Sequence, residues 1–91
     1  MKRNEILETA AKIVSGHREQ EYGSPEDNFR KIATLWEAYL GIHIDAADVA
    51  IMMMLFKAGR LATGNGSVDT WVDIAGYAAC GGEIATGSDT E

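Results

Sequence analysis

The sequence is poor in cysteine and in cations, and it has no long apolar run. It is 91 residues long and has one cysteine, Cys80, which excludes a disulfide framework and favours a reducing cytoplasm. Eight Lys and Arg residues stand against fourteen Asp and Glu residues, a net charge of −6. This balance disfavours a nucleic-acid backbone as partner, but a small anionic ligand needs only a few local cations. No run approaches the roughly 18 apolar residues of a membrane span, and no apolar segment follows the charged N-terminus. We therefore expect a cytoplasmic protein with no membrane or nucleic-acid partner.

Familiar sequence motifs of enzymes are also missing. The sequence has no P-loop, no Gly-rich dinucleotide fingerprint and no Ser-centred nucleophile motif. His17 and His43 lie far apart and have no Cys or His partner at zinc-ligand spacing. Any site must therefore be built from carboxylates, cations and aromatic rings.

The periodicity of the apolar residues predicts an all-α, four-helix bundle-like domain over residues 1–85, followed by a flexible acidic tail at 86–91. The helices are expected at about 4–15, 25–40, 45–61 and 67–84. Ser24 and Pro25 give the second helix an N-cap and a first residue, and Gly41 is its expected stop. Ser67 or Asp69 caps the fourth helix.

Residues 45–61 are apolar almost all round. A helix without a polar face must be surrounded by other helices, so we expect this one to be buried at the centre of the domain. Four short helices cannot cover it completely. The sequence therefore predicts a homo-oligomer.

Inward faces can be assigned from helical spacing. The expected positions are Ile6, Ala10, Ile13 and Val14 in the first helix, Phe29, Ile32, Ala33, Trp36, Tyr39 and Leu40 in the second, and Val72, Ile74, Ala75, Ala78 and Ala79 in the fourth. Gly76 costs about 1 kcal/mol relative to Ala in mid-helix, which suggests a close helix contact or ligand approach there. Cys80 is interpreted as a small packing residue.

Two carboxylates open the apolar helix. Asp45 and Asp48 are three residues apart and share one face of its first turn. They can act as an N-cap and a first-turn acid, or they can share a Mg²⁺ ion, which needs further oxygen ligands from elsewhere. Both interpretations are open at this point.

Two cations close the same helix. Lys57 and Arg60 also share a face, and together they suit phosphate oxygens. Asp73 in the following helix could pair with either cation or add oxygens to a metal. Arg18 and Tyr22 precede the helix that starts at Ser24, and helix N-termini bind anions. Tyr22 or Tyr77 would lie beside a base or sugar.

The run Asp45-x-x-Asp48-Val49 resembles the second half of the metal motif of MazG-like all-α NTP pyrophosphatases, in which E-x-x-D opens a similar helix. The resemblance implies an all-α fold in which Mg²⁺ is held by Asp45, Asp48 and Asp73, and water attacks the α–β phosphate linkage. Those enzymes carry E-E-x-x-E on the preceding helix. In residues 29–37 of this chain only Glu37 can take that place.

A second resemblance extends over most of residues 18–80. It is carried by Tyr22-Gly23, Asn28-Phe29, Leu35-Trp36, Lys57 to Arg60, and Asp69 to Tyr77. These pairs are similar to those of small phage-encoded helical proteins of unknown function. The resemblance implies a phage origin.

Three hypotheses follow for the function. The first is binding of a small phosphorylated nucleotide through Lys57, Arg60 and Arg18, to sequester a nucleotide signal or handle an unusual nucleotide. No cofactor is required for this. The second is a Mg²⁺-dependent MazG-like pyrophosphohydrolase that uses Asp45, Asp48, Asp73 and Glu37. The third is a structural or protein-binding helical bundle.

Overall fold

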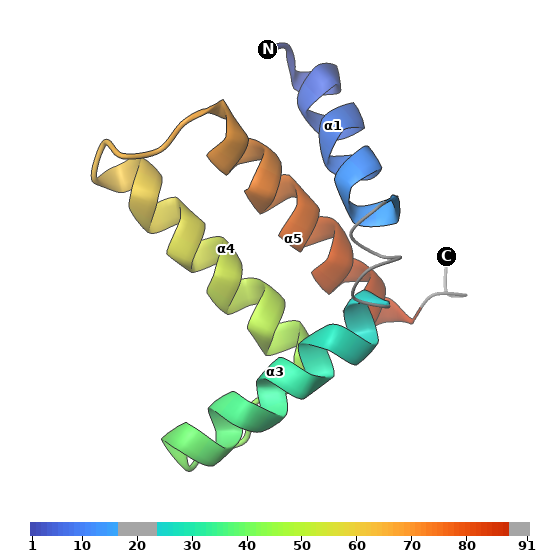
Figure 1. Cartoon of the computed structure of the whole chain (residues 1–91), viewed down its shortest axis with the longest axis vertical. Helices are drawn as coiled ribbons and strands as arrows, with labels where there is room; N and C mark the ends of the chain where they lie inside the picture. Colours follow the sequence, from blue (N-terminus) through green and yellow to red (C-terminus); the bar gives the residue numbers. More distant parts are fainter. Residues whose placement is uncertain (17–23, 88–91) are drawn as a thin grey trace.

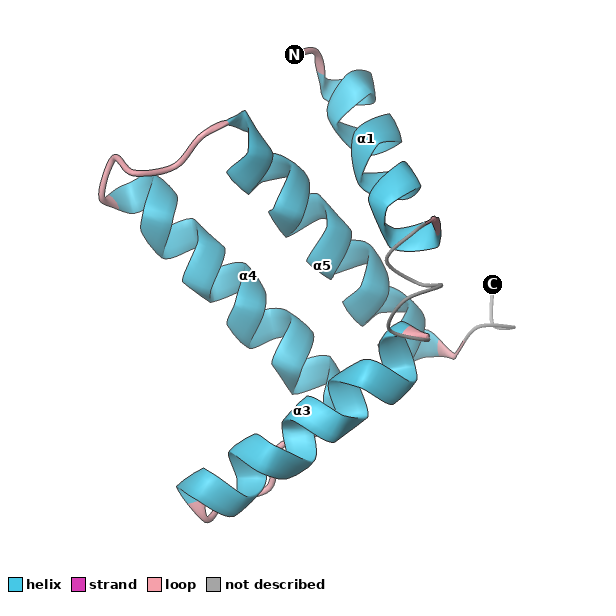
Figure 2. Cartoon of the chain, in the orientation of Figure 1, coloured by secondary structure: helices cyan, strands magenta, loops and turns pink. Residues whose placement is uncertain are grey.

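The computed structural model describes residues 1–16 and 24–87. These residues form four α-helices, α1 (Arg3–Ser15), α3 (Pro25–Leu40), α4 (Ala46–Ala62) and α5 (Val68–Thr86), and they contain no strand (Figure 2). The all-α prediction is confirmed. In this part of the chain, no helix combines the length and apolarity needed to cross a membrane.

The helices form a layer of three with a fourth across one end. α4 and α5 run antiparallel side by side, and α1 lies along the other side of α5 (Figure 1). α3 crosses near the start of α4 and the end of α5, and its C-terminal end projects past the start of α4. The crossing brings α3, the beginning of α4 and the end of α5 together.

Capping interactions set the helix boundaries. The Ser24 hydroxyl accepts a hydrogen bond from the N–H of Asp27, and Gly41 ends α3 in the left-handed conformation with φ +74°, both as predicted. Asp45 caps α4, and the N–H of Ser67 donates to the Thr70 hydroxyl at the start of α5.

Two predicted boundaries differ from the structure. α1 begins at Arg3 rather than after Asn4, because the Lys2 N–H donates to Glu5 Oε1 and makes Lys2 the cap. α5 continues to Thr86, two residues past the helix end predicted at 84. Most of the predicted tail, 88–91, lies outside the described residues.

The core lies where α3 crosses α4 and α5. Its buried members are Phe29, Ala33, Ile44, Val49, Ala50 and Cys80. Tyr77 packs against this cluster, with its ring centroid 6.1 Å from that of Phe29. A Cβ on Gly76 would lie 3.3 Å from Val14 Cγ1, so the predicted close helix contact at Gly76 is the contact with α1.

Several residues assigned to inward faces are exposed instead. Tyr39 is 89% exposed and Leu40 49%, because the end of α3 projects beyond the helices that it crosses (Figure 1). Ile13 on α1 and both Ala78 and Ala79 on α5 are also exposed. These assignments were wrong because helical periodicity shows which residues share a face. It does not show where a neighbouring helix packs on that face or how far along the helix the contact extends.

α4 is buried at fewer positions than its composition suggests. Val49 and Ala50 are fully covered, whereas four large apolar side chains are exposed, namely Ile51, Met52, Leu55 and Phe56. Within one chain, α3 and α5 pack against two sides of this helix and leave the remainder open. The structure therefore differs from the expectation of a buried central helix, whereas incomplete cover of this helix within one chain was predicted.

Candidate functional site

A surface pocket of about 560 Å³ lies at the junction of α3, the α3–α4 loop, the start of α4 and the end of α5. We call it the α3–α4 pocket. Its lining residues are Glu26, Arg30, Ala33, Thr34, Glu37, His43, Ile44, Asp45, Ala46, Ala47, Ile84 and Ala85. Concave sites with a few convergent polar groups on an apolar wall are the usual places for small ligands.

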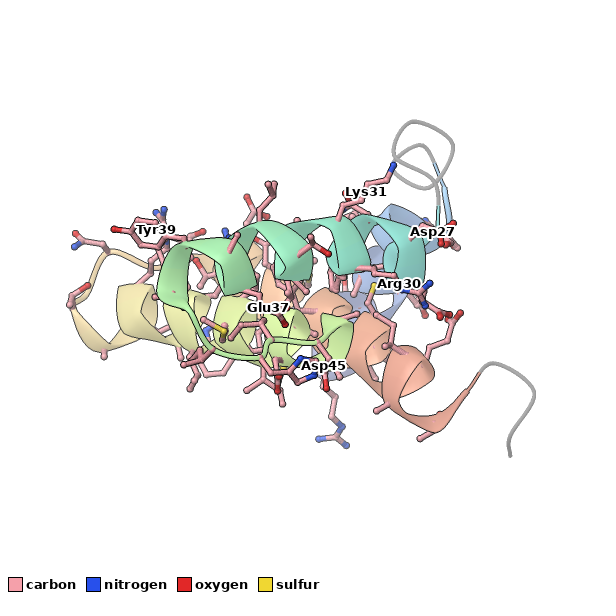
Figure 3. All side chains as sticks on the ribbon, turned by 90° about the horizontal axis from the view of Figure 1, so that it is seen from below. Asp27, Arg30, Lys31, Glu37, Tyr39 and Asp45 are labelled. Atoms are coloured by element: carbon pink, nitrogen blue, oxygen red, sulfur yellow. The ribbon has the colours of Figure 1, made fainter. Side chains whose placement is uncertain are left out.

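The pocket has one wall from α3 and one from the following loop and helix. Glu26, Arg30, Ala33 and Glu37 follow one another at spacings of four, three and four residues, which places them on one face of α3. Figure 3 shows Arg30 and Glu37 on the side of α3 that faces the start of α4, where Asp45 is labelled, and Lys31 on the opposite side. The local order of residues therefore brings charged side chains from two elements together.

Glu37 connects the two walls. Its Oε1 accepts a hydrogen bond from the Ile44 N–H at 2.9 Å and lies 2.9 Å from His43 Nδ1. The backbone hydrogen bond, followed by the contact with His43, lowers the pKa of Glu37 below its ordinary value. Glu37 is therefore a carboxylate at neutral pH, and it holds the loop against α3.

Asp45 and Asp48 form a reciprocal cap. The Asp48 N–H donates to Asp45 Oδ1 at 2.9 Å, and the Asp45 N–H donates to Asp48 Oδ2 at 3.0 Å. The capping interpretation is confirmed. A carboxylate has further lone pairs, so capping leaves a metal role open. Asp45 lines the pocket and Asp48 is not among the lining residues.

The pocket is acidic. Among the described residues, its lining contains three carboxylates, those of Glu26, Glu37 and Asp45, and one permanent cation, Arg30. Arg30 Nη2 lies 2.6 Å from Glu26 Oε1 in an exposed ion pair. Across the described residues, no three His, Cys, Asp or Glu side chains gather closely enough to hold a metal ion alone. A divalent cation here would need oxygens from its ligand.

The cations predicted for phosphate binding lie elsewhere. Lys57 Nζ is 3.1 Å from Asp73 Oδ2, an ion pair between α4 and α5. Arg60 lies over the Phe56 ring, 5.0 Å from its centroid. At 1.5 Å per residue, Arg60 is about 22 Å along α4 from Asp45.

The structure thus divides the predicted site residues between two places. Glu37 and Asp45 both line the pocket, while Lys57 and Arg60 lie in the C-terminal half of α4, where Lys57 pairs with Asp73 of α5. Tyr77 is occupied by core packing. Arg18 and Tyr22 lie outside the described residues, so their predicted role stays a prediction.

Sequence reasoning missed four polar pocket residues, Glu26, Arg30, Thr34 and His43. Arg30 precedes Glu37 by seven residues, which is about two helical turns, so the two side chains share one face of the helix. This spacing could have identified Arg30 as a neighbour of Glu37. The position of His43 depends on the left-handed turn at Gly41 and carries no comparable signal.

The described residues thus form an all-helical domain with an acidic surface pocket. The chain belongs to the family described as "Domain of unknown function (DUF6378)", whose model matches residues 5–85. It is 49% identical over 74 residues to the Gene 55 protein of Mycobacterium phage L5, covering 80% of this chain and 47% of the relative. It is 41% identical over 75 residues to the Gene 55 protein of Mycobacterium phage D29, covering 82% and 50% respectively.

The chain therefore spans about half the length of these curated relatives. No solved structure matches it significantly. The phage resemblance is supported by both relatives, whose printed names say nothing of a ligand or reaction.

Proposed function

We propose that the chain binds a small phosphorylated nucleotide, as its Mg²⁺ complex, in the α3–α4 pocket. One observation carries the proposal. A single pocket brings Glu37 and Asp45, each singled out from the sequence as a possible metal ligand, beside Arg30 and His43. Two residues that the sequence marked as possible metal ligands thus line one pocket, although the cations that it marked for phosphate binding do not.

The donor set of the pocket fits Mg²⁺. Glu37 and Asp45 offer carboxylate oxygens and Thr34 a hydroxyl, which are the hard ligands this ion prefers. Mg²⁺ commonly takes one or two carboxylates and completes its shell with water and phosphate oxygens, so the lack of a third acidic ligand is compatible with a nucleotide-bound ion. When bound, the ion supplies the positive charge that lets an anionic phosphate enter an acidic pocket.

Arg30 and His43 would contact the phosphates. Arg30 presents a planar guanidinium suited to bidentate phosphate contacts. Its present partner, Glu26, is more than half exposed, and such surface pairs contribute at most about 1 kcal/mol, so a phosphate can displace it. The apolar wall formed by Ala33, Ile84 and Ala85 offers a surface for the base or sugar.

In this proposal the chain binds the nucleotide and does not hydrolyse it. The resemblance of Asp45-x-x-Asp48 to the MazG-like motif implies the pyrophosphohydrolase as the alternative. Glu37 would be the sole counterpart of the carboxylate cluster that those enzymes carry on the preceding helix. Sequestration of a nucleotide signal and handling of an unusual nucleotide both require only binding.

Equilibrium dialysis against nucleoside triphosphates and cyclic nucleotides, with and without Mg²⁺, tests the proposal. We expect retention of an intact nucleotide that depends on Mg²⁺. Recovery of nucleoside monophosphate and pyrophosphate would establish the hydrolase instead, and retention of nothing would overturn binding.

Arg30→Ala and Lys31→Ala form a matched pair for locating the site. Both change a cation on the exposed surface of α3, but only Arg30 lines the pocket (Figure 3). We expect Arg30→Ala to weaken retention roughly tenfold, as loss of a charge-assisted hydrogen bond implies. Lys31→Ala should leave it unchanged, and equal effects would place the nucleotide elsewhere.

A further inference from the structure

Among the four described helices, α4 carries the most large apolar side chains that are exposed to solvent. Ile51, Leu55 and Phe56 are each more than half exposed, and Met52 lies beside them. By contrast, half of the buried hydrophobic residues are small, namely Ala10, Ala33, Ala50 and Cys80. These four side chains of α4 thus lie outside the core of the single chain, where they are exposed to water at a cost of about 25 cal/mol per Å².

The spacing on this face is that of a helix–helix seam. Asp48, Met52, Leu55 and Gly59 follow at intervals of four, three and four residues, with Ile51 and Phe56 flanking them. Alternation of three and four residues is the spacing of seam positions in paired helices. A Cβ on Gly59 would meet no atom within 4 Å, so the C-terminal end of the seam is open to close approach.

The charges at the two ends of α4 indicate which kind of helix could pack against this seam. Asp45 and Asp48 lie in its first turn and Arg60 in its last. In an antiparallel pair of α4 helices, the acidic end of one lies beside the basic end of the other, and the helix dipoles oppose. In a parallel pair, like charges meet at both ends. The face is therefore complementary to itself in the antiparallel orientation.

We propose that α4 pairs with α4 of a second copy of this chain, antiparallel about a two-fold axis that passes between residues 53 and 54. A two-fold interface uses the same face on both copies, so each contact occurs twice. Met52 packs against Leu55 of the second copy, and Asp48 lies level with its Gly59. Arg60 of the second copy is then level with the first turn of α4. The inference does not depend on the nucleotide proposal.

Light scattering of the full chain at micromolar concentration gives the first test. We expect about twice the 9.8 kDa mass of one chain. Leu55→Glu, at the centre of the seam, should reduce the mass to that of one chain. Leu35→Glu is the matched control, because Leu35 on α3 is similarly exposed but lies outside the seam (69% against 66%). A wild-type monomer, or equal effects of the two variants, would overturn the proposal.

Disulfide trapping tests the orientation. Met52→Cys and Leu55→Cys are prepared separately and oxidised alone or mixed, with the wild type as control for Cys80. The antiparallel register predicts a disulfide-linked dimer in the mixture and little in either variant alone. Links within each variant alone would establish a parallel pair, and no link above the wild-type control would remove α4 from the interface. Circular dichroism confirms that each variant keeps its helices.

Discussion

Lys57 on α4 and Asp73 on α5 join the two longest helices through an ion pair, with 3.1 Å between Nζ and Oδ2. The Lys57 side chain is 20% exposed and that of Asp73 38%. The pair is thus more protected from water than the exposed Arg30–Glu26 pair. The position of Lys57 is explained by a structural contact, which leaves Arg60 as the more accessible cation at this end of α4.

Asp73→Asn should lower the free energy of unfolding by about 1–2 kcal/mol, because it leaves the largely covered Lys57 without its counter-charge. Asp69→Asn on the exposed side of the same helix is the control, with a loss below about 1 kcal/mol from the helix dipole alone. Urea denaturation measures both. Equal losses would show that the ion pair adds nothing to stability.

Asp45→Asn separates capping from metal binding. Asn caps a helix about as well as Asp, so the melting temperature should hardly change. The substitution removes a carboxylate charge from the pocket, and Mg²⁺-dependent retention of nucleotide should fall at least tenfold. Asp45→Ala should lose the cap as well and cost about 1 kcal/mol. Unchanged nucleotide retention in Asp45→Asn would mean that Asp45 is only a cap.

Two neighbouring glycines of α5 should respond in opposite directions to alanine. A Cβ on Gly81 would lie 2.8 Å from Ala50 Cβ, so Gly81→Ala must push α4 and α5 apart, with an expected loss of about 1–3 kcal/mol. A Cβ on Gly82 would meet nothing within 4 Å. Gly82→Ala should therefore gain up to about 1 kcal/mol from helix propensity. Denaturation midpoints that move in the same direction would contradict the packing of α4 on α5.

Glu37 should make stability depend on pH. Because its pKa in the folded chain is lowered, mainly by the Ile44 N–H, ionised Glu37 stabilises the fold at neutral pH. That contribution should be lost as the pH falls below the ordinary carboxyl range and through the lowered pKa. The stability difference between wild type and Glu37→Gln should thus be largest near pH 7 and shrink towards pH 3. A stability difference that does not change with pH would contradict this.

Local signals in the sequence predicted most of the fold. Ser24, Pro25, Gly41 and Asp45 act within a few residues of their own positions, and the helix boundaries that they mark are confirmed. Local signals could not predict the exposure of Tyr39, because it depends on where along α3 the contacts with α4 and α5 end.

The candidate site was predictable only in part. Glu37 and Asp45 were identified from a motif and from a helix start, and both line the pocket. Their position in one pocket with Arg30 and His43 depends on how α3 crosses α4, where Phe29 and Ala33 are buried in the core. Lys57 and Arg60 were identified by charge alone, and charge does not distinguish an ion pair from a ligand site.

The placement of α1 has a consequence for the motions of the chain. Among the described residues, α1 packs on α5 alone, with Ala10 as its single buried residue and Val14 against Gly76. Local unfolding starts where buried contacts are fewest. We expect α1 to detach while α3, α4 and α5 stay together, so its amides should exchange with deuterium well before those around Val49. The protein would then behave as a three-helix unit with a reversibly docked fourth helix.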